Sequence, residues 1–217
     1  TGKLIQEKST HEQRYEGIHV KKKVPFLYLE GDGVLIRGQR KTRLEIHRFQ
    51  VSEGIEKRGN RSTLIHPHFV SHLNRQQAQK EMMNYLQATY DLKETIVISN
   101  SDGGSGYEKD VFEELSLGCF RHEHFRDKYH VHQKIKERLN FVPSLQKKWI
   151  EAVSQYDFGK VQACLDTAES LIGDEHEEKY KEQLRLLTAY LQRNWGYLCP
   201  LKARGIQDKR ACIGTIE

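Results

Sequence analysis

The sequence predicts an α/β fold that carries an all-helical insertion, and three observations support this prediction. Residues 24–36, VPFLYLEGDGVLI, form a dense β-favouring run, and residues 43–55 follow with rough alternation of apolar and polar side chains. A helical segment, a short apolar strand and a second helical segment come next, an order that indicates a mixed sheet flanked by helices. After Cys119 the strand signal largely disappears, and amphipathic helical segments take over.

The helices and the strand of the first part follow from periodicity and from end signals. In residues 74–90 apolar side chains recur at three- and four-residue steps, namely Ala78, Met82, Tyr85 and Leu86. Residues 94–104, ETIVISNSDGG, read as an apolar strand that ends in a glycine-rich loop. Residues 107–118 place Val111, Phe112 and Leu115 on one helical face, with Gly118 at the position of a C-terminal cap.

Residues from about 140 to about 198 form the predicted helical insertion. Three segments each gather apolar residues on one face: Leu145, Trp149 and Val153; Val161, Leu165 and Ala168; Tyr180, Leu184, Leu187 and Leu191. The predicted organisation is a charged N-terminal segment or linker (1–23), the first part of the core (24–139), the insertion (140–198) and a return to the core (199–217). The chain begins at Thr1 within charged sequence, so we expect a further segment before it.

Composition narrows the class of protein. The net charge is +5, with 11 histidines in reserve, and this mildly favours a polyanionic partner. The four cysteines, Cys119, Cys164, Cys199 and Cys212, form no CxxC pair, which argues against a disulfide scaffold and for a reducing, cytoplasmic compartment. No apolar run approaches the roughly 20 residues that a membrane-spanning helix needs, so we expect no membrane insertion.

Asp32 lies between two glycines inside an otherwise apolar run. Glu30 and Asp32 are two residues apart, so an extended strand would point both to the same side. Buried carboxylates need a cation or hydrogen bonds to compensate them. Two interpretations are open: a site for a cation, or a tight turn at Gly31-Asp32-Gly33 with aspartate as turn former.

Asp102 follows a buried strand at the edge where α/β sheets commonly place functional groups. The glycines after it would let a bulky ligand approach the backbone closely. The same letters, SDGG, also make an ordinary loop. A phosphate-binding P-loop is a poor match, because no Gly-Lys-Ser/Thr follows.

A third candidate is the stretch after the second helix, where Cys119 and His122 are spaced C-x2-H and His124, His130 and His132 lie nearby. These residue types could bind zinc, but no second pair with the usual spacing completes four ligands. A polar face that packs near a phosphodiester and a plain solvated surface are the other interpretations.

Glu217 is the fourth candidate. Carboxylates from separate strands and helices can converge on two divalent ions about 4 Å apart, and these ions activate a nucleophile and stabilise the leaving oxygen of a phosphodiester. Magnesium suits an all-oxygen site of this sort. A core with Asp32 and Asp102, followed by a helical insertion before the last acid, fits that arrangement.

The sequence resembles the transposases of bacterial insertion sequences of the ISLre type, which overlap a group of uncharacterised transposase-like proteins. Three segments carry the resemblance: LYLEGDGV, the segment from Thr95 to Leu139, and the terminal GTIE. The resemblance extends from about Tyr28 to Glu217, and its specificity lies in the ordered set. That family belongs to the DDE transposases, so the resemblance implies a ribonuclease H-like catalytic fold. It assigns the two catalytic aspartates and the catalytic glutamate to Asp32, Asp102 and Glu217.

The resemblance implies a polynucleotidyl transferase that cuts DNA at the terminal inverted repeats of an element and joins the 3′-hydroxyl to target DNA. Two Mg²⁺ ions, or Mn²⁺ in their place, would be held by the three acids. Cys119 and His122 match the C-x2-H signature that accompanies the core in Mutator-like relatives. A homo-oligomer at work on DNA in the bacterial cytoplasm and nucleoid is implied as well. Five basic residues could contact phosphates: Lys21, Lys22, Lys23, Arg58 and Arg61.

The resemblance also implies what would complete the protein. In the family the glutamate begins a further helix and a basic segment follows, so we expect weak or no cleavage by a chain that stops at Glu217. Two alternatives stay open: an inactive, nucleic-acid-binding remnant of a transposase, and a zinc-dependent hydrolase built on the Cys/His stretch.

Overall fold

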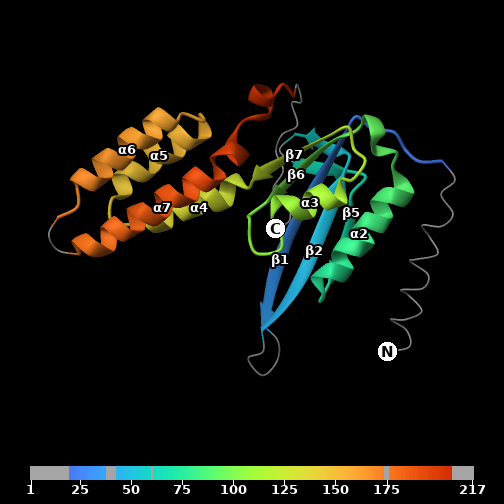
Figure 1. Ribbon diagram of the computed structural model, residues 1–217, viewed down its shortest axis with the longest axis horizontal. Coiled ribbons are helices and arrows are strands. Elements are labelled where there is room, and N and C mark those ends of the chain that lie inside the picture. The colour runs from blue at the N-terminus through green and yellow to red at the C-terminus, as the bar shows by residue number, and fades with distance from the viewer. Residues whose placement is uncertain (1–19, 38–42, 60, 174–175, 207–217) are drawn as a thin grey trace. The chain divides into compact units, whose positions relative to one another are not determined.

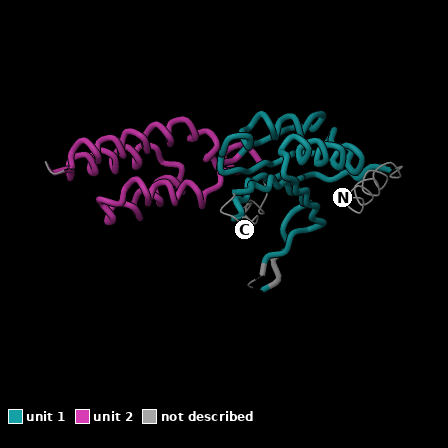
Figure 2. The backbone as a smooth tube through the Cα atoms, turned by 90° about the horizontal axis from the view of Figure 1, so that it is seen from below, with its two compact units in different colours: residues 1–124, 212–217 teal, residues 125–211 magenta. Residues whose placement is uncertain are grey.

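A computed structural model describes residues 20–37, 43–59, 61–173 and 176–206. The chain divides into two compact units, and the division falls between His124 and Phe125 (Figure 2). The first unit contains nearly all of the two sheets, and the second is mainly helical. Each unit has a hydrophobic core of its own.

The first unit is built on a five-stranded mixed sheet with the order β5-β2-β1-β6-β7 (Figure 1). The strands are β1 (Phe26–Arg37), β2 (Arg43–Ser52), β5 (His68–His72), β6 (Ile96–Ser101) and β7 (Arg121–Arg126). β2 is antiparallel to both β1 and β5, whereas β1 and β6 are parallel. This sheet and its flanking helices confirm the predicted α/β class and are consistent with a ribonuclease H-like fold.

β1 continues through Gly31-Asp32-Gly33, so the turn interpretation of these three residues is wrong. Gly31 pairs with Phe49 of β2, and Asp32 pairs with Arg48. A Cβ added at Gly31 would lie only 2.9 Å from ring atoms of Phe49 and of Tyr107. Glycine is therefore needed here because aromatic rings pack directly on the strand backbone.

Two helices cover one face of this sheet: α2 (Arg75–Thr89) and α3 (Lys109–Leu115). The predicted apolar faces are confirmed, since Ala78, Met82, Leu86, Phe112 and Leu115 are buried. They join Leu27, Leu29, Phe49, Val51 and Val70 of the sheet in one core. The core thus holds β1 and β2 against both helices.

Some elements gave no clear sequence signal. β3 (Gly54–Arg58) and β4 (Arg61–Ile65) form a separate two-stranded sheet, and a short 3₁₀ helix covers Leu92–Glu94. β5 and β7 were also missed, because both are short and rich in polar side chains.

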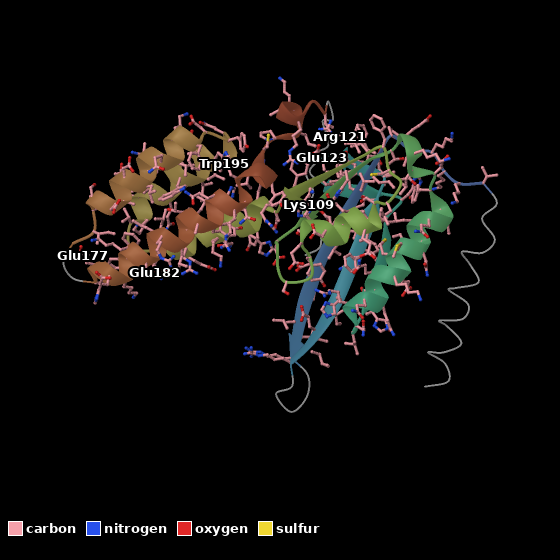
Figure 3. All side chains as sticks on the ribbon, viewed as in Figure 1. Lys109, Arg121, Glu123, Glu177, Glu182 and Trp195 are labelled. Carbon is pink, nitrogen blue, oxygen red and sulfur yellow. The ribbon has the colours of Figure 1, made fainter. Side chains whose placement is uncertain are left out.

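The second unit contains α4 (Lys128–Arg138), α5 (Pro143–Ser154), α6 (Phe158–Ser170), α7 (Glu177–Leu198) and a 3₁₀ helix (Leu201–Arg204). The three predicted apolar faces are confirmed, with Leu145, Trp149, Val153, Val161, Ala168, Leu184, Leu187 and Leu191 buried. Trp195, labelled in Figure 3, lies on α7. Its ring stacks on that of Tyr156, with ring centroids 4.8 Å apart. No helix in the described ranges is both long enough and apolar enough to cross a membrane.

The helical unit begins earlier than the predicted boundary at residue 140. Val131 and Ile135 of α4 are fully buried and belong to the same core as Trp149. α4 contacts α5 and α7, which explains why it joins them. The described part of the predicted return to the core, residues 199–206, also belongs to the helical unit.

Candidate functional site

Asp32 and Asp102 line a single cavity of about 380 Å³ in the first unit. The parallel pairing of β1 and β6 explains this, because Glu30 lies opposite Asn100 and each aspartate follows two residues later. The cavity is also lined by Glu45, His47, Arg75 and Tyr107. The structure thus brings two of the three predicted acids together, and the third, Glu217, lies outside the described residues.

The loop after β6 holds Asp102 through short polar contacts. The Gly104 N–H donates to Asp102 Oδ1 at 2.7 Å, and the Tyr107 N–H donates to the Gly104 carbonyl at 3.0 Å. The Ser101 hydroxyl donates to the Tyr107 carbonyl at 2.6 Å. Gly103 and Gly106 have φ angles of 79° and 89°, a region that favours glycine. The SDGG loop therefore has a defined shape that fixes one oxygen of the Asp102 carboxylate.

Asp32 reaches the cavity from β1, half-buried, and the Gly33 N–H donates to its Oδ1 at 2.7 Å. Gly33 is also a point of close approach, because a Cβ there would collide with the carboxylate of Glu45. The cavity therefore carries three carboxylates: two predicted ones and Glu45 of β2. Glu30, on the buried part of β1, instead accepts a hydrogen bond from Gln50 Nε2 at 3.0 Å.

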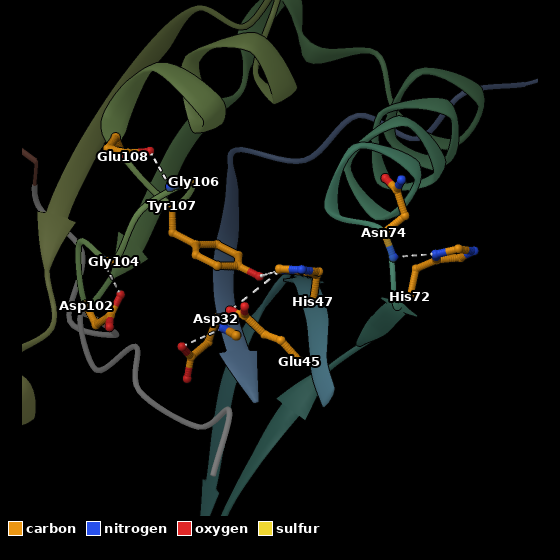
Figure 4. A network of polar contacts seen from close by, with 11 residues as sticks. Asp32, Glu45, His47, His72, Asn74, Asp102, Gly104, Gly106, Tyr107 and Glu108 are labelled. Carbon is orange, nitrogen blue, oxygen red and sulfur yellow. Dashed lines mark hydrogen bonds and ion pairs between the residues drawn. The ribbon is translucent and has the colours of Figure 1, made fainter. Parts of the chain in front are cut away.

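Tyr107 and His47 join the loop to β2. The Tyr107 hydroxyl lies 2.8 Å from His47 Nδ1, and the His47 ring lies 4.0 Å from Glu45 Oε1 (Figure 4). Burial raises the pKa of the Tyr107 phenol far above its ordinary value, and the charges of Glu45 and Asp32 raise it further. The phenol therefore stays neutral at physiological pH and can donate a hydrogen bond to His47.

Sequence reasoning missed Glu45, His47, Arg75 and Tyr107 as cavity residues. The usable signal was the alternation in residues 43–55, which places Glu45 and His47 on the same face of one strand. Their pairing with β1 at Gly33 depends on the strand register, which that alternation alone does not define.

Comparison with known proteins gives the family. Residues 4–210 match the family described as "Uncharacterised protein family (UPF0236)". The chain belongs to the UPF0236 family. It is 40% identical over 191 residues to a protein of Streptococcus gallolyticus named "UPF0236 protein in vanSb 3'region", across 86% of this chain and 42% of that relative. The chain therefore spans less than half the length of the curated relative it matches.

The C-x2-H residues of this UPF0236 chain lie on and beside β7. His122 Nε2 and His124 Nδ1 are 2.7 Å and 2.8 Å from the hydroxyl of Ser99 on β6. Burial lowers the pKa of His122 to about 4, so the ring is neutral near pH 7. Cys119 packs against the apolar core, where burial raises the pKa of its thiol.

The zinc interpretation finds no set of ligands in the described ranges. His130 and His132 lie on α4 in the helical unit, where His130 Nδ1 is 2.6 Å from Asp127 Oδ2. Among the residues that the structure describes, no group of three or more His, Cys, Asp or Glu side chains is placed to hold a metal ion. The Cys/His stretch instead contributes buried polar contacts between two neighbouring strands.

The predicted phosphate-contacting residues are placed in part. Lys21, Lys22 and Lys23 are exposed; Lys22 Nζ lies 3.2 Å from Glu53 Oε1, and Lys23 Nζ lies 3.8 Å from Asp91 Oδ2. Arg58 and Arg61 pair across the β3–β4 hairpin, and their side chains lie outside the described part of the structure. Of these five residues, the three lysines have described side chains, and none of those three lines the cavity of Asp32 and Asp102.

Proposed function

We propose that this UPF0236 chain is the catalytic part of a DDE-type transposase, which cleaves DNA at the ends of an insertion sequence and transfers the 3′-ends to target DNA. The observation that carries the proposal is the convergence of Asp32 and Asp102 in one cavity. Asp32 lies within β1 and Asp102 directly after β6, at the same level of two parallel neighbours in a ribonuclease H-like sheet. The resemblance of the ordered motifs to ISLre-type transposases supports the same conclusion.

The oxygen donors of Asp32 and Asp102 are of the kind that suits magnesium, and they supply two of the three acids that the proposal requires. Carboxylate oxygens are the ligands that Mg²⁺ prefers, and Asp32 and Asp102 present them in an environment that is only half-buried. When bound, two Mg²⁺ ions, or Mn²⁺ ions, would activate the attacking oxygen and neutralise charge on the leaving oxygen. Asp32 and Asp102 would hold them, with Glu217 as the third ligand under this proposal.

The chain's own residues would orient the DNA and the acids. The Gly104 N–H keeps Asp102 turned in a fixed direction, and the Gly33 N–H does the same for Asp32. Water would attack the phosphodiester in cleavage, and the DNA 3′-hydroxyl would attack it in strand transfer. The proposed partners are therefore the terminal inverted repeats and target DNA, bound by a homo-oligomer in the cytoplasm and nucleoid of the bacterium.

The test uses a version of the protein extended past Glu217. We expect Asp32→Asn and Asp102→Asn each to abolish Mg²⁺-dependent nicking of DNA while DNA binding is kept, because the amide has nearly the same shape but lacks the negative charge that holds the metal. Asp110→Asn is the matched control, since Asp110 is exposed on the short helix α3 and does not line the cavity.

Normal nicking by either variant would refute the proposal. An extended protein that binds DNA equally well with and without Mg²⁺, and never nicks it, would instead identify an inactive nucleic-acid-binding remnant. Stoichiometric zinc that is lost on Cys119→Ser would point to the hydrolase alternative.

A further inference from the structure

Arg75 differs from the other side chains that line the cavity. It is the first residue of α2, and no other Lys or Arg of the described residues lines the cavity. The same lining contains three carboxylates, those of Asp32, Glu45 and Asp102. One fixed cation thus shares a confined volume with three anions.

The guanidinium of Arg75 lies directly against the backbone of Gly106. A Cβ added at Gly106 would overlap the guanidinium, and the φ of 89° also favours glycine there. The positive charge acts on Tyr107 next to this glycine, where it opposes the rise of the phenol pKa. The bare glycine backbone therefore gives Arg75 the space to reach the loop that follows Asp102.

The main chain at Arg75 is held from both sides. The Asn74 side chain caps α2 by accepting the Gln77 N–H at 3.1 Å. The Asn74 N–H donates to His72 Nδ1 at 2.8 Å, as Figure 4 shows. α2 itself packs on β2 and β5. The starting point of the Arg75 side chain is therefore fixed relative to the strands of the sheet.

The guanidinium donors of Arg75 form no hydrogen bond or ion pair with another described residue. A half-buried guanidinium normally directs its five donors to an acceptor. No hydrogen bond or ion pair joins Arg75 to the carboxylate of Asp32 or Asp102, so its donors are available to a ligand that enters the cavity. Two parallel N–H donors match two oxygens of a phosphate group.

We propose that Arg75 binds the non-bridging oxygens of the DNA phosphodiester that enters the cavity of Asp32 and Asp102. This inference rests on the proposed function, because it assigns the substrate of the same site. A phosphodiester that approaches three carboxylates is repelled by them, and the guanidinium offsets this repulsion at the place where the phosphate must stop. Arg75 would thus position the reacting phosphate.

The experiment measures binding of a short DNA duplex of random sequence, by fluorescence anisotropy, to the version extended past Glu217. Ca²⁺ replaces Mg²⁺ so that binding is measured without rapid cleavage. We expect Arg75→Ala to weaken binding by about tenfold and to lower the slope of log K against log salt by about 0.9, the value of one phosphate contact. Arg75→Lys should keep the slope but bind less tightly, because an ammonium lacks the fork.

Lys93→Ala is the matched control, since Lys93 is an exposed cation beyond the other end of α2, roughly 20 Å along the helix. It should keep wild-type affinity and slope, and equal melting temperatures of the variants would show that all are folded. Arg75→Ala with the affinity and slope of Lys93→Ala would overturn the inference. That result, together with loss of nicking in Asp32→Asn and Asp102→Asn, would refute the role of Arg75 alone. Normal nicking by the aspartate variants would instead refute the proposed function and, with it, the assignment of Arg75 to the reacting phosphate.

Discussion

The hydroxyl of Tyr107 lies 2.8 Å from Nδ1 of His47, a contact that joins the loop after Asp102 to the strand that faces Asp32. The two residues are 60 positions apart in the chain, so the contact depends on the folded sheet. It links the two sides of the proposed active site through a neutral phenol and an imidazole.

Tyr107→Phe should lower the free energy of unfolding by about 1 kcal/mol, because it removes this part-buried hydrogen bond and leaves the ring packed on Gly31 and Phe49. Urea unfolding measures the change. Tyr129→Phe serves as control, since it removes an exposed bond to Gln133 and should cost much less. Equal losses of unfolding free energy in the two variants would show that the Tyr107 hydrogen bond stabilises the fold no more than an exposed one does.

Gly31→Ala should destabilise the protein by about 1–3 kcal/mol, because the new methyl group has no room between Phe49, Tyr107 and Phe112. Gly196→Ala is the control in α7, where a Cβ meets no atom within 4 Å. There alanine should stabilise the helix by up to about 1 kcal/mol. Thermal melts of both variants measure the contrast, and a harmless Gly31→Ala would contradict the packing described for β1.

His122 should make the protein less stable as the pH falls from about 6.5 toward 4. Its pKa is about 4 in the folded state, so between these pH values the unfolded chain binds more protons than the folded one. Proton binding therefore stabilises the unfolded state and lowers the free energy of unfolding. His122→Gln should flatten this part of the profile of unfolding free energy against pH. Above pH 7 the profiles of the wild type and of His122→Gln should run parallel, which is the internal control. If the variant kept the wild-type slope below pH 6.5, a buried neutral His122 would be disproved.

Ile135→Ala should weaken the helical unit rather than the sheet. Ile135 is fully buried in the core shared with Trp149, and its truncation should cost about 2–5 kcal/mol. Hydrogen exchange should show lost protection in α5 and α7 with little change in β1 and β6. Loss of protection in β1 and β6 instead would place α4 with the sheet, as the boundary at residue 140 had predicted.

Periodicity made much of the fold predictable. The apolar steps of α2 and α5 and the dense apolar runs of β1 and β6 are strong signals, and the structure confirms them. β7 was not predicted, because its inward side chains are His122 and His124. Their burial depends on hydrogen bonds to Ser99 rather than on apolar character. Sequence patterns do not reveal such bonds.

The candidate site was predictable only where a residue type and a loop signal coincided. Asp32 between glycines and Asp102 before glycines met this condition. Glu45 and Arg75 did not, because each looks like an ordinary exposed charge in a strand or at a helix start. Glu45 reaches the cavity through strand register, and Arg75 reaches it through the packing of α2 on β2 and β5; both are properties of the assembled fold.

Glu30 pairs with Asn100, and each aspartate lies two residues after this pair. The relative position of the two carboxylates therefore depends on this equal spacing. One amino acid inserted into β1 or β6 between the paired position and the aspartate would turn that carboxylate to the opposite side of the sheet, while the other stayed in place. Both aspartates would still be present in a sequence alignment, but their carboxylates would no longer face the same cavity. In relatives, the spacing LEGD against SNSD is therefore a better guide to a competent site than the presence of the two acids alone.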